Sequence, residues 1–310
     1  MGKKQRVIFV VTLSVLVIGA LVFLLTRSNV LVLQPAGNVA EQQRDLMVIA
    51  TLLMLIVVLP VFILTGLIAW RYREGNKKAK YSPGFDSSHV LETVWWIIPL
   101  AIISVLSVII WQSSHKLDPF RPLPHHAEPL RVQVVALQWQ WLFIYPDQDI
   151  ASTNYFRFPE DRPVNFEITA DAPMNSFWIP QLGGQVYAMS GMSTKLHLVA
   201  DKPGEYKGMS ANISGAGFAD MKFIAQATSS SDFDQWVNVI KSRRDPLDIA
   251  SYNELAKPSR GDPDQTFWLK EDDLYNKIVM KYMSPEHAQM KTAEQEHIEQ
   301  EHTTQRGEQY

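Results

Sequence analysis

Three long apolar blocks without a charged residue constrain the fold of this chain more than any other feature. They are Val7–Leu25, Leu46–Trp70 and Thr93–Trp111, and the shortest has 19 residues. About 20 helical residues cross a hydrocarbon layer roughly 30 Å thick. Because backbone amides find no water inside a membrane, each block is predicted to form a transmembrane helix.

The basic residues between these blocks predict their orientation. Lys3, Lys4 and Arg6 precede the first block, and a basic loop from Arg71 to Lys80 separates the second from the third. Positively charged loops stay in the cytoplasm, so the N-terminus and residues 71–92 are predicted inside, and residues 26–45 and everything after 112 outside. The first block is either a cleaved signal sequence or an uncleaved anchor. Its length, and the lack of a small-x-small cleavage site, favour an uncleaved helix.

Composition excludes several other classes of protein. The 310 residues suffice for a membrane anchor and one sizeable external domain, and the net charge of −3 gives no basic surface for nucleic acid. The chain contains no cysteine. Disulfides, thiolate metal sites and a lipoprotein anchor are therefore excluded.

The segment after the third block has the pattern of a β domain. Prolines between Pro119 and Pro129 indicate a stiff linker. Runs of β-branched and aromatic residues, separated by Gly-rich and Asp-rich turns, then predict many short strands, which is typical of a sandwich or barrel. The predicted strand regions are 130–145, 154–158, 163–169, 176–181, 185–189, 194–200, 204–209 and 221–227.

Helices are predicted after the last strand. Ser229 to Ser231 with Asp234 have the composition of a helix start. The next apolar residues, Phe233, Trp236, Val237 and Ile240, form one helical stripe. Two further helices are predicted at 247–256 and 271–283, followed by a polar tail predicted to be disordered.

These patterns divide the chain into a membrane-anchored α+β architecture with five parts. The parts are a signal-anchor or uncleaved helix at 1–28, a transmembrane hairpin at 29–115 with helices at 46–70 and 93–111, an external domain at 116–228, a helical region at 229–283 and a tail at 284–310.

A Gly- and Ser-rich turn near the end of the β domain carries a distinctive spacing. It contains Ser210, Asn212, Ser214, Phe218 and Met221. Upstream, the segment from Asn175 to Pro180 and the segment from Pro203 to Gly208 lie at matching distances. Between about Leu31 and Phe223 the chain resembles subunit II of the haem–copper oxidases. Within that group it is most similar to the cytochrome bo-type ubiquinol oxidases.

The resemblance implies a cupredoxin-like Greek-key barrel in which the metal ligands are lost. In the cytochrome c oxidase branch, the corresponding positions carry His, Cys, Glu, Cys, His and Met around two coppers. Here the six positions hold Asn175, Ser210, Asn212, Ser214, Phe218 and Met221, so only the methionine remains. Serine hydroxyls and a lone thioether are poor copper ligands. We therefore expect no cofactor in this chain, and the resemblance implies that the haems and one copper belong to partner subunit I.

The aromatic run around Trp139 and Trp141 has two interpretations. In the copper-containing relatives, an aromatic cluster here helps to pass electrons from cytochrome c to copper. Without a copper acceptor, packing on the barrel or at a subunit interface is the favoured interpretation.

Glu92 is the remaining candidate site residue. A carboxyl group at the cytoplasmic end of a membrane helix is often only interfacial. However, the motif from His89 to Pro99 matches the family closely. The resemblance implies that Glu92 lies beside the mouth of a proton channel in subunit I, where a carboxyl group can relay protons.

No catalytic motif is present, and none of the histidines is assigned to a metal, including the adjacent pair His125 and His126 and the strand residue His197. The function that the resemblance implies is subunit II of a proton-pumping quinol oxidase in the bacterial inner membrane, with its external domain in the periplasm. The expected partners are subunits I, III and IV, ubiquinol bound through subunit I, and membrane lipid, but neither nucleic acid nor cytochrome c. Two alternatives stay open: a membrane-tethered binding or assembly module, and a cytochrome c oxidase subunit II.

Overall fold

The computed structural model describes residues 19, 30–74, 76, 79, 87–243 and 245–283. The chain forms two compact units, one of residues 41–121 and one of the remaining residues. The predicted first helix and the polar tail lie outside the described residues, apart from residue 19.

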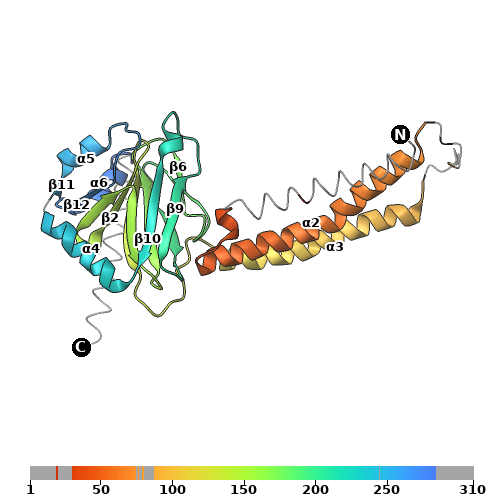
Figure 1. Ribbon diagram of the computed structural model, residues 1–310, viewed down its shortest axis with the longest axis horizontal. Helices are drawn as coiled ribbons and strands as arrows, with labels where there is room; N and C mark the ends of the chain where they lie inside the picture. The colour runs from red at the N-terminus through yellow and green to blue at the C-terminus, as the bar shows by residue number, and fades with distance from the viewer. Residues whose placement is uncertain are drawn as a thin grey trace. The chain divides into compact units, whose positions relative to one another are not determined.

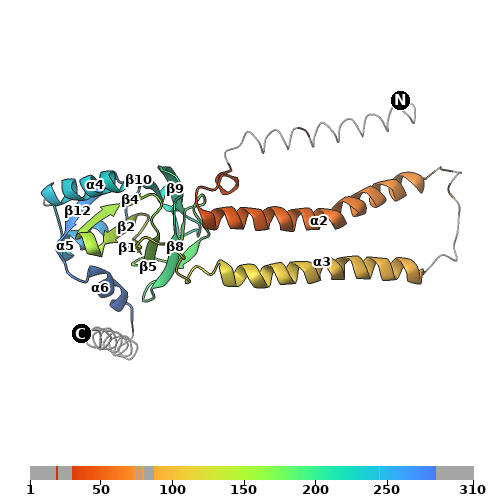
Figure 2. The same cartoon turned by 90° about the horizontal axis from the view of Figure 1, so that it is seen from below.

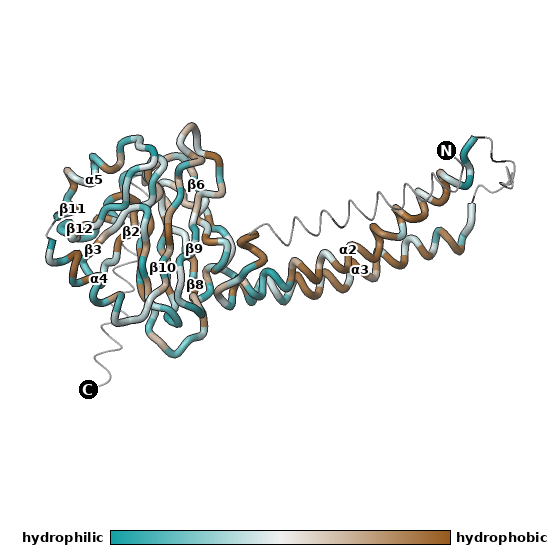
Figure 3. The backbone as a smooth tube through the Cα atoms, in the orientation of Figure 1, coloured by the Kyte–Doolittle hydropathy of each residue, from teal (hydrophilic) through white to brown (hydrophobic). Residues whose placement is uncertain are grey.

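Two long apolar helices make up the first unit. They are α2 (Asn38–Arg71) and α3 (His89–Lys116), both long and apolar enough to cross a membrane. They run in opposite directions, and apolar residues dominate most of their length (Figures 2 and 3). Each helix is longer than predicted because its polar ends also adopt helical geometry. At the start of α2, for example, Arg44 pairs with Glu41 and Asp45.

The second unit is built on two β-sheets (Figure 1). The seven-stranded sheet has the order β11-β12-β3-β2-β1-β5-β8, and the five-stranded sheet has the order β4-β10-β9-β6-β7. Strand β1 pairs in parallel with β5, and β10 pairs in parallel with β4, whereas most neighbours are antiparallel. The strands are β1 (Leu130–Ala136), β2 (Trp141–Tyr145), β3 (Ile150–Thr153), β4 (Tyr155–Pro159), β5 (Val164–Ala170), β6 (Asn175–Trp178), β7 (Val186–Ala188), β8 (Thr194–Leu198), β9 (Gly204–Ser210), β10 (Lys222–Thr228), β11 (Pro246–Leu247) and β12 (Gln265–Leu269).

Apolar side chains fill the space between the two sheets and also cover the outer face of the larger one. The inner core lies between the sheets and includes Trp141, Phe143, Phe177 and Phe223. The outer core packs Leu142 and other residues of β1 to β3 against the C-terminal elements. Every residue of β2 is therefore buried, which explains why this strand is almost continuously apolar.

The predicted strand region 130–145 is two strands in the structure. A tight turn from Leu137 to Gln140 separates β1 from β2, and Trp139 has a φ of 70° there. No Gly, Pro, Asn or Asp marks this turn, and those residues are the usual sequence signals of a turn. The short strands β3, β11 and β12 were not predicted either.

Three helices occur after β10, close to the predicted positions, with β11 and β12 between them. They are α4 (Ser230–Arg243), α5 (Ile249–Leu255) and α6 (Leu274–Met280). The apolar stripe of α4 places Phe233, Val237 and Ile240 in the inner core. In contrast, α5 and α6 pack on the outer core, on the side of the larger sheet that faces away from β9 and β10 (Figure 1).

Candidate functional site

Several of the six positions singled out by their spacing lie close together, where β6 begins and β9 ends. Ser210 donates a hydrogen bond from Oγ to Oδ1 of Asn175 at 3.0 Å, and both residues are buried. The backbone amide of Ser210 also bonds to the carbonyl of Met221, whose side chain is buried in the inner core. Asn212 donates from Nδ2 to the carbonyl of Met174 at 2.8 Å. Four of the six predicted positions are therefore grouped by hydrogen bonds.

Ser214 and Phe218 lie on the adjacent turn, which Trp139 holds in place. The indole Nε1 of Trp139 donates to the carbonyl of Ser214 at 3.2 Å. Gly217 lies directly against the ring, since a Cβ at this position would come within 2.3 Å of it. Glycine is required there because any side chain would displace the indole. The structure gives neither Ser214 nor Phe218 a hydrogen bond to Asn175 or Ser210.

The side chains at these positions do not fit a copper centre. The set offers two hydroxyls, two amides, one phenyl ring and one thioether. Copper sites of this class need thiolate and imidazole ligands. Asn175 moreover accepts a hydrogen bond from Ser210 and donates one from Nδ2 to the Pro173 carbonyl at 2.7 Å. Within the part of the chain that the structure describes, no group of three or more His, Cys, Asp or Glu side chains could hold a metal ion.

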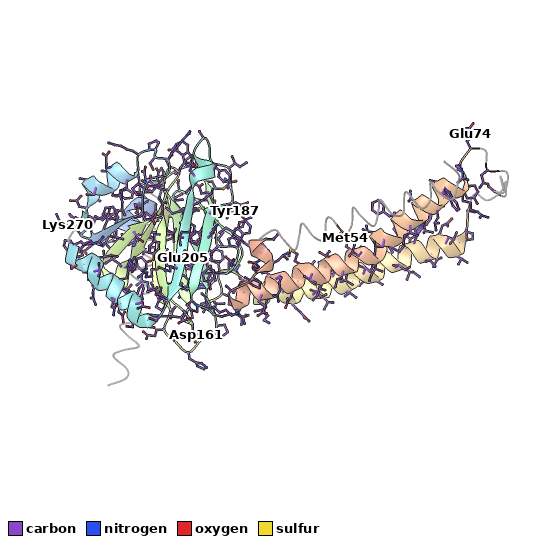
Figure 4. The ribbon with its side chains drawn as sticks, viewed as in Figure 1. Met54, Glu74, Asp161, Tyr187, Glu205 and Lys270 are labelled. Carbon is purple, nitrogen blue, oxygen red and sulfur yellow. The ribbon has the colours of Figure 1, made fainter. Side chains whose placement is uncertain are left out.

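The loops around these residues form a surface without charge, which we call the charge-free end. It consists of residues 172–175, 187–193 and 211–217, none of which is Asp, Glu, Lys, Arg or His. Tyr187 lies on the β6–β7 side of the sandwich, away from the charged Asp161 and Lys270 (Figure 4). Exposed large apolar side chains are concentrated here: Met174 at 43 %, Tyr187 at 51 %, Met192 at 52 % and Ile213 at 80 %.

The two tryptophans of the aromatic run have different environments. Trp141 is fully buried, with its ring edge-on to Phe177 at 5.3 Å and to Phe223 at 5.8 Å. Trp139 is only partly buried and lies between the Ser214 turn and Arg260, whose guanidinium is 5.4 Å from the ring centroid. Trp141 thus belongs to the inner core, whereas Trp139 connects surface loops.

Glu92 lies in the first turn of α3. Its carboxylate accepts a hydrogen bond from the backbone amide of Ser88 at 3.3 Å and lies 3.7 Å from Nδ1 of His89. Acidic side chains are favoured at a helix N-terminus because they interact with the positive end of the helix dipole. This local geometry accounts for the position of the side chain and leaves it half-exposed.

A buried carboxylate that the sequence did not reveal lies beneath the charge-free end. Asp171 follows β5 and accepts hydrogen bonds from the Tyr252 hydroxyl at 2.5 Å, from Lys281 Nζ at 2.9 Å and from the Tyr282 hydroxyl. Burial alone would raise the pKa of Asp171, but these hydrogen bonds and the Lys281 charge outweigh burial and lower it. The pKa of Lys281 is raised, mainly by its hydrogen bond to Asp171. No local motif signals this cluster, because its partners are 81 or more residues away along the chain.

Family models match two segments of the chain. Residues 150–228 match the periplasmic domain of cytochrome c oxidase subunit II, and residues 241–286 match the COX aromatic rich motif. Among solved structures, the periplasmic domain of subunit II of the Bradyrhizobium japonicum cytochrome oxidase is similar over 37 % of this chain and 94 % of its own length, with 20 % identity and a TM-score of 0.36. The family match over residues 150–228, together with the two apolar helices, gives the fold class: the cupredoxin-like domain of an oxidase subunit II with apolar membrane helices, as the resemblance implied.

Full-length relatives define the branch of this class. Cytochrome bo(3) ubiquinol oxidase subunit 2 of Pseudomonas putida is 51 % identical over 84 % of this chain and 82 % of its own. Ubiquinol oxidase subunit 2 of Acetobacter aceti is 47 % identical over 81 % of this chain and 82 % of its own, and quinol oxidase subunit 2 of Bacillus subtilis is 41 % identical over 81 % and 79 %. The chain belongs to the quinol oxidase subunit 2 family, whose members are membrane-anchored subunits of haem–copper oxidoreductase complexes.

Proposed function

We propose that this subunit is a copper-free scaffold in a proton-pumping oxidase that receives its electrons from ubiquinol inside the membrane. The hydrogen-bonded pair of Asn175 and Ser210 carries the proposal. In the copper-containing branch these positions carry His and Cys. Here they hold an amide and a hydroxyl that hydrogen-bond to each other, and neither is the imidazole or thiolate that a copper centre of this class needs.

Loss of an external copper relay is chemically consistent with a quinol substrate. Ubiquinol dissolves in lipid and can deliver electrons directly to a redox centre within the membrane. A soluble electron donor, in contrast, needs a relay on the external domain. Under this proposal the haems, the single copper and the quinol-oxidising site belong to subunit I, and the chain described here binds none of them.

The charge-free end is proposed as the surface that binds subunit I. An apolar, uncharged patch on an otherwise charged domain favours a protein interface, because the desolvation cost of burying it is low. Met174 and Ile213, on two different loops, provide exposed apolar contacts. Subunits III and IV complete the complex. Because Arg71, Arg73 and the lysines up to Lys80 precede α3, we infer that this loop is cytoplasmic and that the domain lies in the periplasm of a bacterial inner membrane.

Glu92 is proposed as a proton-uptake residue on the cytoplasmic side. It lies half-exposed at the N-terminus of α3, accepts a hydrogen bond from the Ser88 amide and lies 3.7 Å from His89. This position is compatible with a carboxylate that receives protons from water.

The scaffold proposal is tested on the complex purified through an affinity tag on this chain. We expect haem absorption bands in the preparation, oxygen uptake with ubiquinol, and none with a reduced soluble haem protein. Elemental analysis of the chain after separation from its partners should show no stoichiometric copper. A folded chain isolated without haem would favour the membrane-tethered module. Copper bound to the separated chain, or oxygen uptake driven by the soluble donor, would favour a cytochrome c oxidase subunit.

A further inference from the structure

The C-terminal motif, defined here as residues 249–283, contacts two loops of the charge-free end directly and the third through Trp139. The first contact is made to the loop at 171–175. Asp171 begins this loop, and its buried carboxylate is held by Tyr252 of α5 and by Lys281 and Tyr282, which follow α6. Met174, one of the exposed apolar residues, lies only three residues further on.

The second contact is made to the loop at 187–193. The Ser193 hydroxyl and the Tyr275 hydroxyl of α6 share a hydrogen bond of 2.8 Å. Gly191 of the same loop lies against Tyr282, since a Cβ there would come within 3.1 Å of the Tyr282 carbonyl oxygen. Gly191 has a φ of +74°, a conformation that glycine adopts without strain. Met192 is thus flanked by two residues that touch the motif.

The third contact reaches the loop at 211–217 through Trp139. The motif is hydrogen-bonded to the turn before β2, where Gln140 Nε2 donates to the Leu255 carbonyl at 2.6 Å and the Ser259 amide donates to the Gln138 carbonyl at 3.3 Å. Arg260 lies over one region of the Trp139 ring, while Gly217 and the Ser214 carbonyl contact the same indole. Trp139 therefore connects the C-terminal motif to this loop, because it contacts both.

We propose that the C-terminal motif is an internal brace that holds these three loops in the conformation that binds subunit I, with Asp171 as its central positioning residue. The proposal rests on the proposed docking function of the charge-free end. These loops contain little regular secondary structure. If they became ordered only when subunit I binds, the conformational entropy lost would reduce the affinity for subunit I. A brace that orders them beforehand removes that cost.

The polar contacts of the motif differ from the apolar support that α5, α6 and β12 give to the larger sheet. The inner core contains no residue of the C-terminal motif, because it is filled by side chains from the two sheets, α4 and the loops between them. The polar contacts to Asp171, Ser193 and the Gln138–Gln140 turn are all made at loops or strand ends, and α6 lies beside β5, the strand that leads to Asp171 (Figure 2). Loss of one such contact should therefore loosen loops before it unfolds the sandwich.

The experiment compares the full-length wild type with Asp171→Asn and the matched control Lys277→Gln. Lys277 belongs to the same motif, but the ion pair that the structure gives it is with Glu271, which is not part of the three loops. Two quantities are measured: the haem retained per tagged chain after a stringent detergent wash, and amide hydrogen exchange of the detergent-solubilised chain. In Asp171→Asn we expect at least a fivefold loss of retained haem and faster exchange in residues 171–175 and 187–193, with exchange in β9 and β10 unchanged. Lys277→Gln should match the wild type in both.

Each other outcome decides against the brace or against the docking function. Unchanged loop exchange in Asp171→Asn overturns the brace. Faster loop exchange with full haem retention shows that the ordered loops are not needed to bind subunit I, which overturns the docking function. If the variant does not fold, Tyr252→Phe is used instead; it removes one hydroxyl and keeps the Asp171–Lys281 pair, and the same two readings then decide. If the wild type itself retains no haem, it is the docking function of the charge-free end, rather than the brace, that fails.

Discussion

Among single residues, Ser210 offers the most direct test of how the candidate site is held together. Its hydroxyl donates to Asn175, and both side chains are buried. In Ser210→Ala the Asn175 oxygen loses this donor, and a buried polar atom without a partner costs about 1–3 kcal/mol. We expect the midpoint of urea unfolding of the purified chain to fall accordingly. Ser230→Ala, at an exposed position of α4, should change it little. Equal midpoints for the two variants would show that this pair contributes nothing to the fold.

What the sequence could reveal about single residues depended on the distance over which they interact. The spacing of Ser210, Ser214 and Met221 was visible because these residues are close along the chain, and in the structure Ser210 is hydrogen-bonded to Asn175. Asp171 could not be found in this way. Its partners Tyr252 and Lys281 come from a segment that follows the whole sandwich. Only the folded chain brings them together, and a lone Asp after a strand has the appearance of an ordinary turn residue.

For the helices and strands, local signals were sufficient where the element is stabilised locally. The start of α4 was predicted from its serines, but the partner is Asp232 rather than Asp234. Ser229 Oγ accepts the amide of Asp232 at 3.1 Å and donates to its carboxylate at 2.8 Å. This is the spacing of a capping box, in which the first and fourth residues pair. Strands β3 and β12 were missed because they are short and are stabilised by pairing with each other across a long stretch of sequence.

The N-terminal cap of α4 allows the size of a change in the free energy of unfolding to be predicted. Ser229→Ala removes the hydroxyl that satisfies a free amide of the first turn, and such substitutions cost about 1 kcal/mol. The free energy of unfolding, measured by urea titration of the purified chain, should fall by this amount. Ser231→Ala on the exposed side of the same turn serves as the control. A loss of similar size in the control would indicate that helix propensity, not capping, controls this end of α4.

The C-terminal elements should make the stability of the chain sensitive to acid through Asp171. Its pKa is lowered in the folded state by Tyr252, Tyr282 and Lys281, which outweigh the opposing effect of burial. A lowered folded pKa contributes stability that is present above the unfolded value, near pH 4, and is lost as pH falls through the folded value. We expect the difference in unfolding free energy between the wild type and Asp171→Asn to be constant near neutral pH and to shrink below about pH 4. A difference that stays constant down to pH 3 would show that Asp171 carries no charge-dependent contact.

At the scale of the whole chain, the helices α2 and α3 and the class of the β domain were predicted from different kinds of sequence information. The apolar blocks that form α2 and α3 can be recognised directly from their residue types, because a membrane-spanning segment must be predominantly apolar. The sandwich was predicted only as a class by its strand pattern, because pairing between distant strands such as β1 and β5 leaves no local trace. Family resemblance supplied the arrangement that the pattern could not.

Glu92 provides the prediction that involves the whole complex. If protons reach the oxygen-reducing centre past this side chain, Glu92→Gln removes the exchangeable carboxyl proton but keeps nearly the same shape and most hydrogen-bonding capacity. Oxygen uptake with ubiquinol should then fall severalfold, because a relay without an ionisable group transfers protons slowly. The haem content per chain should stay at the wild-type value, since the contacts of this carboxylate among the described residues are with its neighbours Ser88 and His89.

The control for this prediction is Glu74→Gln, a carboxyl group at the end of α2 on the same proposed side of the membrane (Figure 4). Both substitutions remove one negative charge from that side, so a general effect of surface charge on proton supply would slow them equally. A specific relay slows only Glu92→Gln. The defect should also lessen as pH falls, because a higher proton concentration increases direct uptake from water. Equal turnover in the wild type and both variants would leave Glu92 with the local role its geometry already explains, an acidic side chain stabilising the first turn of α3.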